Sequence, residues 1–82
     1  MGLFDAKAPS IGEEAATAFA AGRLVFVAML DARLKDTPFS REIDVWSDEI
    51  MSIEHAGWGL TQMSTGEAGH NVVRMYCVFH RR

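Results

Sequence analysis

The sequence predicts an α+β domain: a three-stranded antiparallel sheet with one main helix packed across it, preceded by an extended arm and a short helix. Residues 71–80 alternate between two sets of side chains, which is the period of a strand. Another stretch has apolar residues at spacings of three, four and three, the period of a helix: Ile43, Trp46, Ile50 and Ile53. A chain of 82 residues allows one small domain.

The amino-terminal residues divide into an arm and a short helix. Residues 1–9 show no period, so we expect an extended arm. Ser10 and Glu13 have the spacing of a capping box, and Gly22 is a typical residue just beyond a helix end. These signals predict a helix of about eleven residues, which is shorter than an isolated helix needs in water and must therefore pack on something.

The first strand and the main helix follow. Residues 23–34 begin with β-branched and aromatic side chains and predict a strand. Pro38 disfavours helical geometry at Thr37, so residues 35–41 form a connection. We expect the main helix over 44–55, with Asp44 as its N-cap and Gly57 ending it.

Two further strands complete the domain, over 58–64 and 71–80. Two glycines within residues 65–70 favour a flexible hairpin loop over a tight two-residue turn. The chain therefore divides into an arm with a short helix, 1–22, and a β-α-β-β domain, 23–82.

Two stretches form a recognisable pattern: Ile53-Glu54-His55-Ala56-Gly57-Trp58-Gly59-Leu60 and Tyr76-Cys77-Val78-Phe79-His80-Arg81-Arg82. They resemble a family of small bacterial domains of unknown function, whose members read I-E-x-E-G-W-x-L and, after a variable hairpin, end an aromatic-rich strand in F-x-R. Ala56 replaces the usual acidic residue, so an interaction made by that acid is not carried over. The resemblance covers about residues 23–82 and implies a β-α-β-β fold but no activity.

Charge and hydropathy argue against membranes and nucleic acids as partners. The net charge is −3, Arg74 and residues 80–82 form only a weak basic end, and the pair Arg81-Arg82 is typical of a solvated tail. The longest apolar run, Leu24 to Leu30, has seven residues, against about 20 for a spanning helix. No signal peptide is visible, so we expect a cytoplasmic protein, or a virion protein if the gene belongs to a phage.

No catalytic residue, cofactor or metal site is predicted. The three histidines, His55, His70 and His80, lack the spacing of metal ligands. Cys77 is the only cysteine, which excludes an internal disulfide. Because it falls on the apolar face of the last strand, we expect a buried thiol with a raised pKa rather than a nucleophile.

Apolar side chains lie on both faces of the predicted sheet, but one helix covers only one face. The second face holds these residues: Val25, Val27, Met29, Tyr76 and Val78. Three strands of about seven residues give that face roughly 330 Å². Either the amino-terminal helix folds over it, with Ile11 and Phe19 as contacts, or another subunit does.

We therefore expect a non-enzymatic interaction module, either homo-oligomeric or an accessory subunit of a larger complex, including a phage-derived one. Two such faces bury roughly 660 Å², less than the roughly 1,200 Å² of a standard interface. Leu3 and Phe4 of the arm would add to this contact. The alternative is a small-ligand-binding oligomer that uses aromatic side chains (Trp46, Trp58 or Tyr76) at a subunit cleft.

Overall fold

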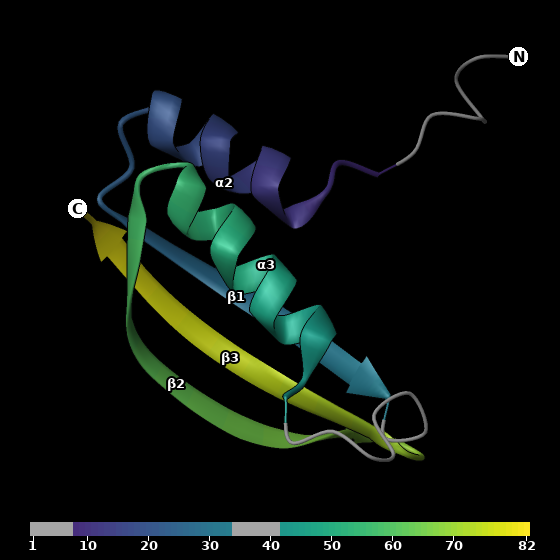
Figure 1. Ribbon diagram of the computed structural model, residues 1–82. Coiled ribbons are helices and arrows are strands. Elements are labelled where there is room, and N and C mark those ends of the chain that lie inside the picture. Colours follow the sequence, from purple (N-terminus) through teal and green to yellow (C-terminus); the bar gives the residue numbers. More distant parts are fainter. Residues whose placement is uncertain (1–7, 34–41) are drawn as a thin grey trace, which may run out of the picture.

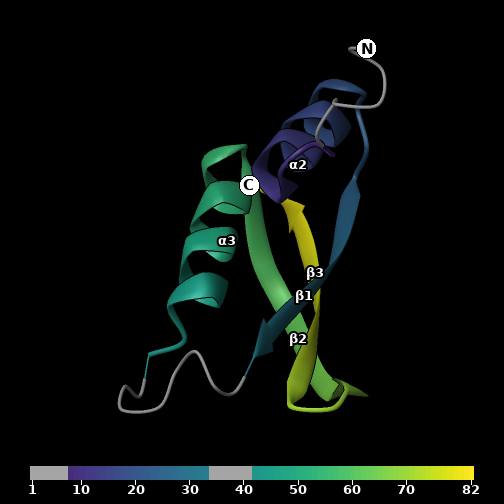
Figure 2. The same ribbon diagram turned by 90° about the vertical axis from the view of Figure 1, so that its right-hand side faces the viewer.

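The computed structural model describes residues 8–33 and 42–82, and it confirms the α+β fold (Figure 1). Two helices and three strands follow one another in these ranges: α2 (Ile11–Ala20), β1 (Val25–Arg33), α3 (Asp44–His55), β2 (Trp58–Gly69) and β3 (Val72–Arg81). The strands form one antiparallel sheet in the order β1-β3-β2, and α3 lies on one side of it (Figure 2). We call the side facing α3 the inner face and the other side the outer face.

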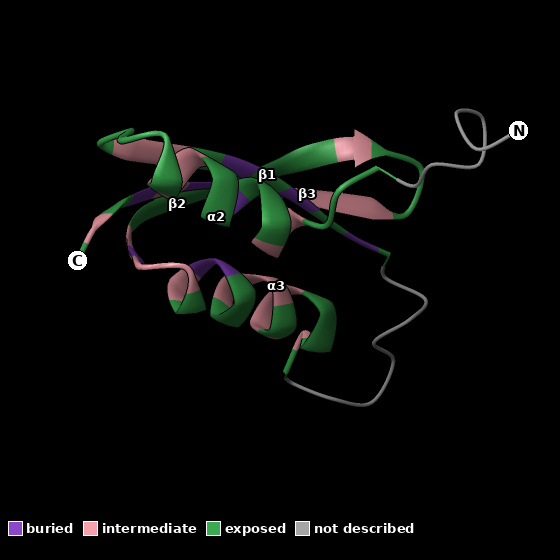
Figure 3. Cartoon of the chain, turned by 90° about the horizontal axis from the view of Figure 1, so that it is seen from above, coloured by how far each residue is buried: buried purple, intermediate pink, exposed green. Residues whose placement is uncertain are grey.

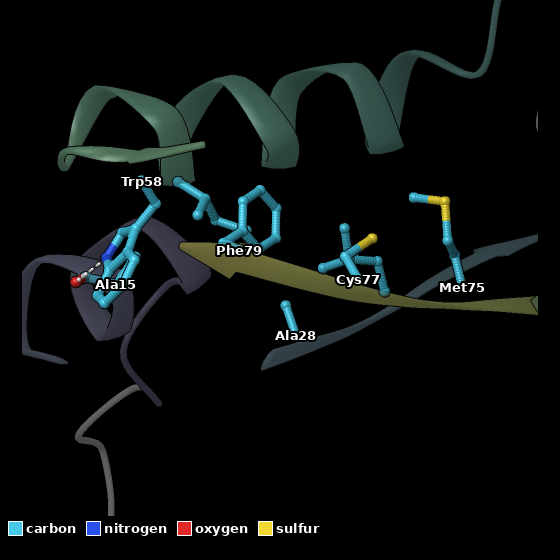
Figure 4. Close-up of a cluster of buried hydrophobic side chains, with 8 residues drawn as sticks. Ala15, Ala28, Trp58, Met75, Cys77 and Phe79 are labelled. Carbon is cyan, nitrogen blue, oxygen red and sulfur yellow. Dashed lines mark hydrogen bonds between the residues drawn. The ribbon is translucent and has the colours of Figure 1, made fainter. Parts of the chain in front are cut away.

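The core lies between α3 and the inner face. Alternate residues of β3 are buried there, namely Met75, Cys77 and Phe79, and they point toward α3 (Figure 4). Strand β1 contributes Ala28 and Leu30 to the same cluster. Most of the fully buried residues belong to the strands (Figure 3). This arrangement confirms the predicted helix-facing side of the last strand.

Helix α2 belongs to the same core. Its predicted capping box is present: the Glu13 amide donates to the Ser10 hydroxyl, and the Ser10 amide donates to the Glu13 carboxylate. Ala15 is fully buried, and the Trp58 indole N–H donates to the Ala15 carbonyl at 2.9 Å (Figure 4). Phe19 packs edge-on against the Trp58 ring.

This position of α2 bears on one of the two possible covers of the outer face, the amino-terminal helix itself. Ile11 and Phe19 pack against the buried core cluster, not on the outer face over Val25, Val27 and Val78. Of the two alternatives, the one in which α2 covers the outer face of its own sheet is therefore not the one observed. The physical reason is Trp58, whose large ring and buried N–H provide an apolar surface and a hydrogen-bond donor for α2 at the end of the core.

The hairpin between β2 and β3 is tighter than predicted. Gly69 pairs with Val72, so only His70 and Asn71 form the turn. Asn71 adopts a left-handed conformation with φ of 61°, which is the geometry that a tight hairpin turn requires. The expected six-residue loop is wrong because residues 65–69 continue the ladder opposite β3.

The two ends of α3 each show a feature that the sequence did not predict. Ile43, not Asp44, is the N-cap residue, and it makes no side-chain capping hydrogen bond. Asp44 instead lies in the first turn, where its charge still complements the helix dipole. At the other end, Gly57 has φ of +111°, and a Cβ there would overlap the Phe19 ring. Gly57 therefore both ends α3, as predicted, and lets α2 approach.

Candidate interaction surface

Five apolar side chains form what we call the outer patch: Val25, Val27, Met29, Tyr76 and Val78. The strand register places Val27 beside Val78 and Met29 beside Tyr76 on the outer face. Val27 is 63% exposed, Met29 55% and Tyr76 44%, while Val25 and Val78 are half-buried. The sequence-derived residues are therefore neighbours in space, on the face opposite α3.

An ion pair closes one end of the outer patch. Arg74 donates to both carboxylate oxygens of Asp31, from Nε at 2.7 Å and from Nη2 at 3.0 Å. The two residues are direct neighbours across β1 and β3. Their hydrogen bonds lower the pKa of the Asp31 carboxyl and raise that of Arg74. The pair therefore leaves this end of the patch without net charge.

The β2 side of the outer face is polar. Gln62 and Ser64 lie beside Val78 and Tyr76 in the register. The Thr61 hydroxyl donates to the Val78 carbonyl at 3.0 Å and lies 2.9 Å from His80 Nδ1. The apolar surface is therefore displaced toward β1 instead of being centred on the sheet.

A groove of about 550 Å³ adjoins the patch where α2 passes the start of β1. Ala18 of α2 and Ala21, the C-cap residue of that helix, line one wall, and Val25, Phe26 and Val27 of β1 line the other. Sequence reasoning missed this groove because it depends on where α2 docks. The only signal available was the row of small residues at the end of the predicted helix.

The cysteine and the three histidines, considered above as a nucleophile and as metal ligands, do not come together in a site within the described residues. Cys77 is fully buried, and desolvation raises the pKa of its thiol, as predicted. His55 ends α3, His70 lies in the hairpin turn and His80 faces outward on β3. Within residues 8–33 and 42–82, no three His, Cys, Asp or Glu side chains form a group that could hold a metal ion.

The terminal arginines do not form a solvated tail. Arg81 donates to the carbonyls of Phe19 and Arg23, and its guanidinium lies 3.7 Å from the centre of the Phe19 ring. Arg82 donates to the Glu54 carbonyl at 2.7 Å. Each cation thus lies at the carboxyl end of one helix, where carbonyl groups lack intrahelical partners.

The aromatic residues considered for a ligand cleft do not converge on one surface. Trp58 is fully buried in the core, Trp46 packs partly against that core from α3, and Tyr76 lies on the outer face. Leu3 and Phe4, the expected anchors of the arm, lie outside the described residues.

No family model, curated protein or solved structure matches this chain. No helix in the described ranges is long and apolar enough to cross a membrane.

Proposed function

We propose that this protein is a non-enzymatic assembly module that packs its outer patch against a second copy of itself. One observation carries the proposal: Ile11 and Phe19 of α2 and Ile50 and Ile53 of α3 pack in the inner core, while no helix among the described residues covers the outer patch, where Val27, Met29 and Tyr76 are exposed. The largest apolar patch on a monomeric protein covers about 300–600 Å² and often has a function.

The charges around the patch support a second copy as its partner. Asp31 and Arg74 already satisfy each other, so a neighbouring subunit that covers them need not bury an unpaired charge. The neighbouring β2 side chains, Gln62 and Ser64, are polar and uncharged. Two identical patches can therefore stack without opposing unpaired charges, since Arg33, the next outer-face cation of β1, lies beyond the patch at the end of the strand.

The area of the outer face determines how tightly two copies are expected to associate through it. Strands of nine to twelve residues in a three-stranded sheet give a face of about 430 Å², taking the nine residues of β1 as the shared length. Stacking two such faces buries about 860 Å² in total, below the roughly 1,200 Å² of a standard interface. Face stacking alone therefore predicts weak, concentration-dependent association.

Two other roles compete with self-association. An accessory role in a larger complex would use the same patch, but it predicts a monomer when the protein is pure. A small-ligand site would rely on aromatic side chains, and Trp58 is fully buried with its indole N–H donated to Ala15. Tyr76 remains on the outer face, so we favour a protein partner over a ligand.

Val27→Glu tests the proposal directly. Because Val27 is 63% exposed, the substitution should leave the fold unchanged while placing a charge in the middle of the interface. The control is Leu24→Glu, the same kind of change at an apolar residue that is 74% exposed and precedes β1. The measurement is molar mass by light scattering after gel filtration over a range of concentrations, with circular dichroism to verify the fold.

We expect the mass of the unmodified chain and of Leu24→Glu to rise above 9.1 kDa with concentration. Val27→Glu should remain at the monomer mass throughout. An unmodified chain that stays at 9.1 kDa at every concentration would overturn the proposal. So would a folded Val27→Glu variant that associates as strongly as the control.

A further inference from the structure

The two edge strands of the sheet, β1 and β2, differ in how regularly they pair with the central strand. The register of β2 against β3 shifts between Leu60 and Gln62, where Thr61 is the extra residue, and again between Glu67 and Gly69. Such irregularities bend an edge strand and interrupt the row of backbone groups that another strand would pair with. The free edge of β2 is therefore protected against pairing.

The free edge of β1 has no such protection. All nine of its residues pair with β3 without a shift, from Val25 to Arg33, and none of them is proline, glycine or lysine. Within the described ranges, β1 has a strand neighbour on one side only. A regular, mostly apolar edge of about 30 Å is a template for pairing with another strand.

We propose that β1 pairs antiparallel with β1 of a second copy, which joins two sheets into one of six strands. This inference rests on the proposed self-association and names a second contact for it. Full overlap of the two strands places Met29 beside its own copy at the two-fold axis. Val27 then faces Asp31 of the partner subunit, and Val25 faces Arg33 of the partner subunit, so no like charges are opposed.

The inner-face side chains of β1 are complementary in size in this register. Phe26 lies opposite Ala32 of the partner subunit, and Leu30 lies opposite Ala28 of the partner subunit. Each large side chain thus meets a small one, which avoids both overlap and voids at the junction. The same strand would not fit itself as well in a register that opposed the two large residues.

Edge pairing also supplies the area that face stacking lacks. A two-fold axis perpendicular to the sheet keeps both outer patches on the same face, which doubles that face to about 860 Å². Two six-stranded sheets stacked through these faces bury about 1,700 Å², above the roughly 1,200 Å² of a standard interface. The complete assembly would then contain four copies, about 36 kDa as four times 9.1 kDa.

A cysteine at the two-fold axis separates edge pairing from face stacking. Residues directly opposed across antiparallel strands have Cα atoms about 5 Å apart, within the range of a disulfide, whereas stacked sheets lie about 10 Å apart, beyond it. Met29→Cys should therefore form a covalent dimer under mild oxidation. The native Cys77 is fully buried, so the unmodified chain, treated in the same way, gives the background level of covalent dimer.

Two matched controls lie on the same outer face. Tyr76→Cys is on the central strand, which has no free edge. Val27→Cys is on β1, but in the proposed register its own copy lies four residues away along the strand, about 13 Å. Covalent dimer is read on a non-reducing gel at a concentration where light scattering shows association.

The proposal predicts several-fold more covalent dimer in Met29→Cys than in either control. Equal or greater cross-linking in a control, or none in Met29→Cys, overturns edge pairing. If the unmodified chain still exceeds 9.1 kDa in that case, edge pairing fails and the proposed function stands. If the unmodified chain is a monomer, both fail.

Discussion

Trp46 and Glu49 each bury a polar atom that has no hydrogen-bond partner in the described part of the chain: Trp46 Nε1 and Glu49 Oε1. The two residues are three positions apart on α3, on the same side of the helix. Desolvation raises the pKa of the Glu49 carboxyl, and the Asp31 carboxylate adds to the effect. The ionised form of Glu49 is therefore disfavoured in the folded state.

Glu49→Gln is expected to stabilise the protein at neutral pH. Since the folded-state pKa is raised, protonated Glu49 favours folding at pH below its ordinary value of 4.5, and this contribution is lost as pH rises. The gain at pH 7 should be at most on the order of 1 kcal/mol, because the side chain is only half-buried. It should shrink as pH falls below 4.5.

Urea unfolding followed by tryptophan fluorescence, at pH 7 and at a pH below 4.5, measures the difference in the free energy of unfolding between Glu49→Gln and the unmodified chain. Glu67→Gln, at an exposed position on β2, is the control and should change little. A gain for Glu49→Gln that is as large in acid as at pH 7 would contradict the account.

Residues with local roles could be predicted from the sequence, and residues with distant partners could not. The Ser10–Glu13 capping box and the helix end at Gly57 depend on neighbours along the chain, and both are confirmed. Arg81 and Arg82 bind carbonyls of helices far away in sequence, at Phe19 and Glu54. Nothing in a terminal pair of arginines indicates which helix ends lie nearby.

Among the elements, α2 packs mainly against α3 and less against the sheet. It contacts α3, and its Phe19 packs against the Trp58 ring. Trp58 Nε1 also donates a buried hydrogen bond of 2.9 Å to the Ala15 carbonyl of α2. Gly12 keeps the two helices close, since a Cβ there would lie 3.1 Å from the Ser52 Cβ. The attachment of α2 therefore depends strongly on one indole.

Trp58→Phe should lower the free energy of unfolding by roughly 1–3 kcal/mol, because it removes a buried hydrogen bond as well as ring volume. Trp46→Phe is the matched control, since the Trp46 N–H is buried without a partner in the described ranges and nothing bonded is lost. Denaturant unfolding followed by circular dichroism compares the two. A cost for Trp46→Phe equal to or above that of Trp58→Phe would contradict this role of the Trp58 hydrogen bond.

The type and order of the elements could be predicted, but the length of β2 could not. The predicted boundaries of the main helix, 44–55, are confirmed because its apolar spacing is regular. Glycines at 66 and 69 suggested a loop, yet both pair with β3. The turn is instead set by Asn71, whose left-handed conformation is a property of one residue and is not visible in a strand pattern.

For the whole molecule, the arrangement of layers is the feature that bears on function. The sequence predicted apolar residues on both faces of the sheet, and the structure places Val27, Met29 and Tyr76 on the face without a helix. It could not predict which face α2 joins, because that choice depends on the buried Trp58 ring. With α2 in the inner core, the outer patch has no cover among the described residues.

Methionine oxidation reports directly on whether another subunit covers the outer patch. Three methionines are almost equally exposed in the single chain: Met29 at 55%, Met51 at 54% and Met63 at 56%. Only Met29 belongs to the outer patch, since Met51 lies on α3 and Met63 pairs with Cys77 of the inner face. The two others therefore serve as internal controls within one sample.

The measurement is the rate of sulfoxide formation at each methionine in dilute peroxide, read by mass spectrometry of peptides at low and high protein concentration. If a second copy covers the outer patch, the three rates are similar at low concentration, and Met29 alone is oxidised several-fold more slowly at high concentration. Equal oxidation of Met29, Met51 and Met63 at every concentration would contradict it.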